Sequence, residues 1–174
     1  MSKEFLKGMF AVVAVAALVL FVGWKAASAY SYHDHELVGT WKVTVQLNNC
    51  NGVLIGGPFS SLLTFAEGET MIEDTMNPGF AVGQRGTGHG VWQTQGWRKY
   101  GAKSIAFINF TTPPTVAPPS PGFKQGTQTI TQTIEFTDGP DSWTTEGNAQ
   151  VEFADTTGTV YRSACATATA QRLE

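Results

Sequence analysis

Residues 39–47 read Gly-Thr-Trp-Lys-Val-Thr-Val-Gln-Leu, with a large apolar side chain at every second position from the tryptophan onward. Successive side chains of a β-strand point to opposite faces, so these apolar residues share one face and the lysine, threonine and glutamine between them share the other. The alternation therefore predicts a strand over residues 38–47, with one face in an apolar core and the other in water.

The same alternation recurs along the rest of the chain, whereas no window after residue 37 has a helical period. Clusters of glycine, proline, asparagine and aspartate separate the apolar runs, as turns do. We expect an all-β fold with eight antiparallel strands, over residues 38–47, 58–66, 69–75, 87–95, 102–111, 124–136, 142–153 and 159–172. An up-and-down barrel is the expected architecture, because pairing the first strand with the last removes both open edges.

Composition limits the class of protein. The chain has 174 residues, of which 42% are apolar and 14% charged, so it suits one globular domain and excludes a disordered or collagen-like protein. The formal net charge is −3 and the 11 basic residues are scattered, so we expect no nucleic-acid partner.

The N-terminal residues have the order of a secretory signal: Lys3 and Lys7, then an apolar run over residues 8–23, then Ala-Ser-Ala at residues 27–29. We expect a signal helix over residues 1–29, a tail over 30–37 and the barrel domain over 38–174. The protein would then be secreted or reside in the periplasm or cell envelope. The alternative is an uncleaved membrane anchor, because residues 9–24 are only slightly fewer than the roughly 17–25 that span a bilayer. That segment is the one membrane contact we expect.

Two cysteines, Cys50 and Cys165, remain after such cleavage, and in an oxidising compartment they are expected to form a disulfide. Two separate buried thiols are the alternative. If the cysteines lie opposite each other on the first and last strands, Val43 pairs with Arg172 and Val45 with Ala170. The inward valines then face small side chains.

Metal binding has little support in the sequence. His33 and His35 lie in the expected N-terminal tail, but a complete Cu or Zn site normally needs three or four fixed ligands. We therefore expect no metal site and no cofactor.

Gly39-Thr40-Trp41, the eight expected strands and Arg172 at the end of the last strand together resemble the lipocalin (calycin) family, in particular secreted bacterial lipocalin-like proteins. In that family the tryptophan plugs the closed end of the barrel and an arginine of the final strand packs across it. The resemblance thus implies a structural cation–π contact between Trp41 and Arg172. Avidin-like barrels, which also begin with Gly-Thr-Trp, use several tryptophans around a small ligand, and Trp92, Trp97 and Trp143 keep this variant open.

An eight-stranded barrel is either filled by its side chains or holds one small ligand. Gly88, Gly90 and the alternating alanines of residues 164–170 add little bulk, which favours a cavity. The residues that we expect to line it are Val43, Val45, Leu63, Phe65, Trp92, Phe107, Gln128, Ile130, Gln132, Ile134 and Phe136. The alternative is that these residues form a packed core.

Two of these residues are amides on an otherwise apolar face. Gln128 and Gln132 alternate with Ile130 and Ile134, so if that face is the inner one the amides need buried partners, and a ligand could supply them. If it is the outer face, the threonines between them point inward instead.

Three functions are therefore open. Binding of a small hydrophobic or amphipathic ligand is the first. A cyclase or isomerase on the same scaffold is the second, with His89, Glu73 or Asp74 moving a proton, although no catalytic motif supports it. The third is a filled barrel with a structural role in the cell envelope, which self-associates through threonine-rich outer strands such as residues 124–133.

Overall fold

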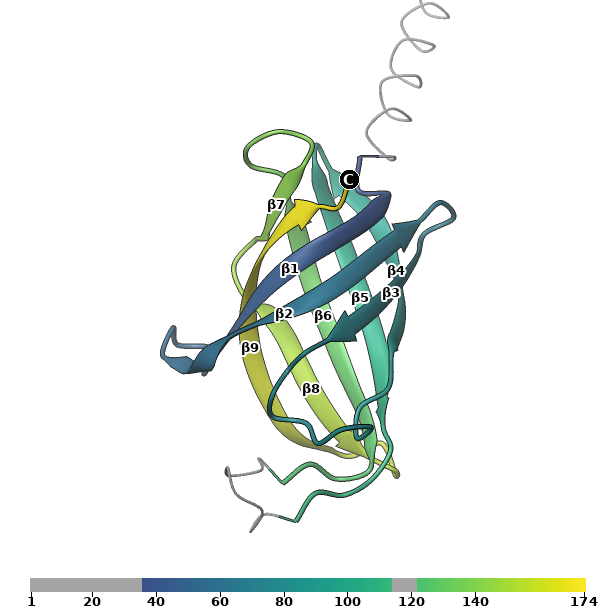
Figure 1. The fold of residues 1–174 in the computed structure, drawn as a ribbon, viewed down its shortest axis with the longest axis vertical. Helices are drawn as coiled ribbons and strands as arrows, with labels where there is room; N and C mark the ends of the chain where they lie inside the picture. The colour runs from purple at the N-terminus through teal and green to yellow at the C-terminus, as the bar shows by residue number, and fades with distance from the viewer. Residues whose placement is uncertain (1–35, 114–121) are drawn as a thin grey trace, which may run out of the picture. The chain divides into compact units, whose positions relative to one another are not determined.

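Nine antiparallel strands form one sheet in the computed structural model, which describes residues 36–113 and 122–174 (Figure 1). The strands are β1 (Gly39–Asn48), β2 (Leu54–Ala66), β3 (Thr70–Thr75), β4 (Gly88–Gly96), β5 (Lys99–Ile108), β6 (Gly126–Glu135), β7 (Ser142–Thr145), β8 (Ala149–Asp155) and β9 (Val160–Arg172). They belong to a compact unit, Leu37–Glu174. The expected signal peptide lies outside the described residues.

The sheet closes on itself. β1 pairs with β2 on one side and with β9 on the other, and each later strand pairs with its neighbours in order around the sheet. The fold is thus all-β, antiparallel and barrel-like. This closure was expected, because an unpaired first or last strand would expose a row of backbone donors and acceptors.

The expected register between the first and last strands is wrong by two residues. Val43 pairs with Ala170, and Arg172 pairs with Trp41 instead. The reason is that Cys50 lies beyond Asn48, the last residue of β1, in a turn where its φ is 65°. It therefore reaches its partner cysteine without occupying a strand position. A shift of two residues leaves every side chain on its expected face.

The seventh expected strand is broken into β7 and β8, which is why nine strands are found instead of eight. Both pieces pair with β6 and with β9, so they occupy one position in the sheet. Residues 146–148 bulge out between them, and Gly147 has a φ of 65°. The bulge adds two residues relative to β6, which is one full period of the strand. Trp143 and Ala149 consequently both face the core.

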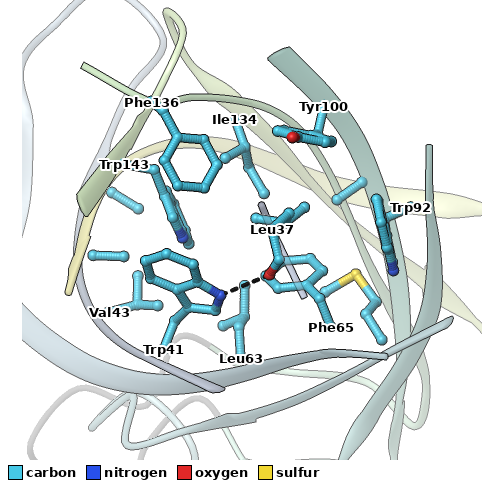
Figure 2. Packing of buried hydrophobic residues seen from close by; sticks show 14 residues of the cluster. Leu37, Trp41, Val43, Leu63, Phe65, Trp92, Tyr100, Ile134, Phe136 and Trp143 are labelled. Carbon is cyan, nitrogen blue, oxygen red and sulfur yellow. Dashed lines mark hydrogen bonds between the residues drawn. The ribbon is translucent and has the colours of Figure 1, made fainter. Parts of the chain in front are cut away.

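One end of the sheet is filled by the Trp41 cluster, which contains Trp41, Phe65, Trp92, Tyr100, Ile134, Phe136 and Trp143 among its buried residues (Figure 2). Trp41 is fully buried and its Nε1 donates a hydrogen bond to the Leu37 carbonyl at 2.9 Å. The Arg172 guanidinium lies 4.2 Å from the centre of the Trp41 ring. The same guanidinium donates to the Val38 carbonyl and to Asp141, so Arg172 covers this end of the core.

A second apolar cluster fills the other end, where the loop between β3 and β4 turns inward. Phe80 of this loop stacks on Phe123, with ring centres 4.4 Å apart, and also contacts Phe153. Gln84 is fully buried and donates to the Phe110 carbonyl. The loop is therefore anchored by an aromatic stack and a buried amide.

The two cysteines form a disulfide that joins the turn after β1 to β9 across 115 residues of sequence. The bond closes a long loop and so restricts the conformations of the unfolded chain. We therefore expect reduction to lower the free energy of unfolding by about 2–4 kcal/mol. Urea unfolding of the oxidised and reduced protein measures the difference. The double variant Cys50→Ser/Cys165→Ser is the control, since reductant should leave its midpoint unchanged. Equal midpoints for the oxidised and reduced wild type would contradict the prediction.

Candidate functional site

A cavity of about 50 Å³ lies where the two apolar clusters meet inside the sheet. Its volume has room for about three to five water-sized groups. Eleven of the eighteen lining residues are apolar, and the seven polar ones come from β2, β3, the loop after β3, β5 and β6. The lining residues are Val43, Val45, Leu47, Phe59, Ser61, Leu63, Met71, Glu73, Thr75, Asn77, Ser104, Gln128, Ile130, Gln132, Ala149, Val151, Ala166 and Ala168.

Small inward side chains leave this volume open. On β9, Ala166, Ala168 and Ala170 lie opposite Leu47, Val45 and Val43 of β1. On β5, Ala102, Ser104 and Ala106 are the inward residues. Because these side chains end close to the backbone, the space between opposite walls is not filled.

The expectation that Phe107 lines the cavity is wrong. Phe107 lies on the outer face of β5 and is 68% exposed. Both faces of this strand carry apolar residues, so its alternation does not by itself say which face points inward. The buried Tyr100 and Ile108 at its two ends place the even-numbered residues inside.

The other expected lining residues divide into two groups. Those at the cavity wall are Val43, Val45, Leu63, Gln128, Ile130 and Gln132. Those in the packed Trp41 cluster are Phe65, Trp92, Ile134 and Phe136. The face of β6 that carries the two glutamines therefore points inward, and the packed-core alternative describes the end of the sheet nearest Trp41.

Glu73, Ser104 and Gln128 line the cavity, and Arg85 joins them from behind to form an interior polar cluster. The Arg85 and Glu73 side chains are only 4% and 7% exposed, and Arg85 Nη2 donates to Glu73 Oε2 at 2.8 Å. Ser104 Oγ donates to the same oxygen at 3.2 Å, and Arg85 Nε donates to Gln128 Oε1. A Cβ on Gly88 would lie 2.7 Å from Glu73 Oε2, so a glycine at this position leaves space for the carboxylate.

Sequence reasoning missed Arg85, because it lies in a loop where alternation carries no information. A signal was available in the inward position of Glu73, between Met71 and Thr75 on β3. A buried carboxylate requires a cation or several donors. That requirement points to a nearby arginine without saying which one.

Of the three candidates for proton transfer, His89 and Glu73 are not brought together. His89 pairs with Ile72, and Gly88 pairs with Glu73, so the histidine and the buried carboxylate lie on opposite faces of the sheet. Asp74 shares the outer face with His89 and accepts a hydrogen bond from the Thr87 hydroxyl at 2.9 Å. Residues 36–113 and 122–174 contain no cluster of three or more metal-ligating side chains.

The cavity wall beside β2 and the end of β3 is only partly covered. β2 is longer than β3, so Leu54, Ile55 and Phe59 pair with β1 and, among the described residues, with no strand on the other side. Phe59, Thr75 and Asn77 line the cavity at this position and are half-buried. A small molecule could enter between β2 and the loop that follows β3.

No family model matches the chain, and no curated protein matches it. Lipocalin membership therefore stays a prediction. The chain is similar to a solved structure of a redesigned β-barrel, at 15% identity and a TM-score of 0.48, over 80% of this chain and 93% of that one. The part of the chain that the structure describes contains no helix long and apolar enough to cross a membrane.

Proposed function

We propose that the protein is exported and binds a small hydrophobic or amphipathic molecule in the interior of its barrel-like sheet. The observation that carries this proposal is the cavity, in which apolar side chains of β1, β6 and β8 face the alanines of β9. Burial of apolar ligand surface against such a wall is favourable by about 25 cal/mol per Å². Shape and burial, more than charge, would hold the ligand.

Two further features support the proposal. The partly covered wall between β2 and the loop after β3 gives a route into the cavity that requires no strand to separate. The disulfide between Cys50 and Cys165 is typical of proteins that reside in oxidising compartments. The disulfide is therefore consistent with export to the periplasm, the cell envelope or the medium.

Native mass spectrometry of protein purified gently from its own host tests ligand binding. We expect a reproducible small adduct that is released on denaturation and can then be identified. In the variant Ala168→Leu the added side chain extends into the cavity, so the adduct should fall at least severalfold, because the new atoms take the ligand's volume.

Thr167→Leu is the matched control, since residue 167 is exposed on the outer face of the same strand. The control should retain the adduct. An apo mass for the wild type, or an unchanged adduct in a folded Ala168→Leu protein, would overturn the proposal.

Assembly is a second candidate function, and one observation favours it. Ile72, His89 and Ile105 are successive cross-strand partners on the outer face of β3, β4 and β5, and Val91 and Phe107 extend this row on β4 and β5. The apolar members are 45–68% exposed, and contiguous exposed apolar surface often marks an interface. Sedimentation velocity at several concentrations separates the candidates, since an interface of this kind gives discrete oligomers and a pure binding protein gives monomer.

A further inference from the structure

The polar side of the cavity has hydrogen-bonding capacity that the protein itself does not use. Glu73 Oε2 accepts hydrogen bonds from Arg85 and Ser104, but no described residue donates a hydrogen bond to Glu73 Oε1. Gln128 Oε1 accepts from Arg85, whereas its Nε2 has no acceptor among the described residues. The Gln132 amide likewise has no partner among them.

These groups line the cavity, where Glu73 and Gln128 are mostly buried and Gln132 is half-buried. Glu73 is 6% exposed and Gln128 is 5% exposed. Buried polar atoms in folded proteins nearly always have a partner, whether protein, water or ligand. The wall thus presents one carboxylate acceptor beside two amides, each able to donate.

The charges in the wall are already balanced. The Arg85 guanidinium donates to Glu73, to Gln128 and to the Gly86 carbonyl, so its cation is compensated by the Glu73 carboxylate and its three nitrogens are occupied. A ligand that brought its own charge would be buried without a counterion, which is costly. An anionic head would in addition meet the Glu73 carboxylate.

We infer that the ligand carries an uncharged head group that both donates and accepts hydrogen bonds, such as a hydroxyl or a primary amide. Its donor lies against Glu73 Oε1 and its acceptor against Gln128 or Gln132, while its short apolar part contacts Val43 and Val45. This inference rests on the proposed ligand-binding function and adds the chemistry of the head group to it. The cavity volume takes the head group and the first few carbons of the chain, so the rest of a six-carbon chain would extend past the half-buried Phe59 and Asn77.

A series of six-carbon probes tests the head group: hexan-1-ol, hexanamide, hexanoate and hexylammonium, with n-heptane as the apolar counterpart. Binding is followed by chemical shifts of the glutamine side-chain amides and backbone amides of the oxidised full-length mature protein. We expect the alcohol and the amide to bind roughly tenfold or more tightly than either charged probe. Equal or tighter binding of hexanoate or hexylammonium would overturn the inference.

The apolar probe separates the inference from the proposed function. If n-heptane binds as tightly as hexan-1-ol, the cavity binds apolar molecules but does not recognise a head group, and the inference alone fails. If no probe binds, both fail.

The variant Gln132→Leu supplies a second test that does not disturb the ion pair. Because Gln132 has no described partner, the variant should fold, bind hexan-1-ol roughly two- to tenfold more weakly and bind n-heptane at least as well. Gln93→Leu makes the same chemical change at an exposed position on β4 and should alter neither affinity. Unchanged hexan-1-ol affinity in Gln132→Leu would remove Gln132 from the site.

Discussion

Replacement of Arg85 by alanine is expected to lower the free energy of unfolding by about 3–5 kcal/mol. The substitution leaves Glu73 nearly buried without its counterion, and the Gln128 carbonyl oxygen loses its donor. An uncompensated charge in a low-dielectric interior is far more costly than the loss of a solvated pair. Urea unfolding followed by tryptophan fluorescence measures the effect at neutral pH.

Two comparisons make this prediction specific. Lys99→Ala removes an exposed ion pair with Glu146, whose side chains are 32% and 47% exposed, and should cost less than about 1 kcal/mol. The double variant Glu73→Leu/Arg85→Leu removes both buried charges and should be more stable than Arg85→Ala. If Arg85→Ala lowers the free energy of unfolding by no more than Lys99→Ala does, the Arg85–Glu73 ion pair is not buried in solution as it is in the structure.

Most of the fold that could be predicted follows from the alternation of apolar and polar residues along single strands. Trp41, Val43 and Val45 point inward because β1 has one apolar and one polar face, and alanines of β9 lie opposite the two valines. Closure followed from the cost of open edges. The break at Gly147 and the turn at Cys50 could not be predicted in this way, because a positive φ or a bulge changes the register without changing the alternation.

The candidate site was only partly predictable, for a related reason. Gln128 and Gln132 could be named as candidates because they alternate with isoleucines on one strand, but only the structure shows that this face points inward. The interior polar cluster instead combines residues from β3, β5, β6 and a loop, so it exists only once those elements have come together. Phe107 was misplaced because apolar residues occupy both faces of β5.

Replacement of Trp41 by alanine is expected to lower the free energy of unfolding by about 3–5 kcal/mol. Trp41 is fully buried and makes edge contacts with Phe136 and Trp143, at ring-centre distances of 5.6 and 6.1 Å. Its removal opens a large cavity and leaves the buried Leu37 carbonyl without the indole donor. Urea unfolding monitored by circular dichroism avoids the change in tryptophan fluorescence.

The contact between Trp41 and Arg172 can be separated from this burial by a double-mutant cycle. Arg172→Ala alone should lower the free energy of unfolding by less than Trp41→Ala does. The coupling energy between the two substitutions should be about 0.5–2 kcal/mol, because the guanidinium lies 4.2 Å from the ring centre and is partly screened by solvent. Trp97→Ala, at a position that is 74% exposed, should change stability by less than about 1 kcal/mol. Similar losses for Trp41→Ala and Trp97→Ala would mean that Trp41 does not organise this end of the sheet. Zero coupling would mean that Arg172 stabilises this end through hydrogen bonds, such as those to Asp141 and to the Val38 and Pro140 carbonyls, and not through the Trp41 ring.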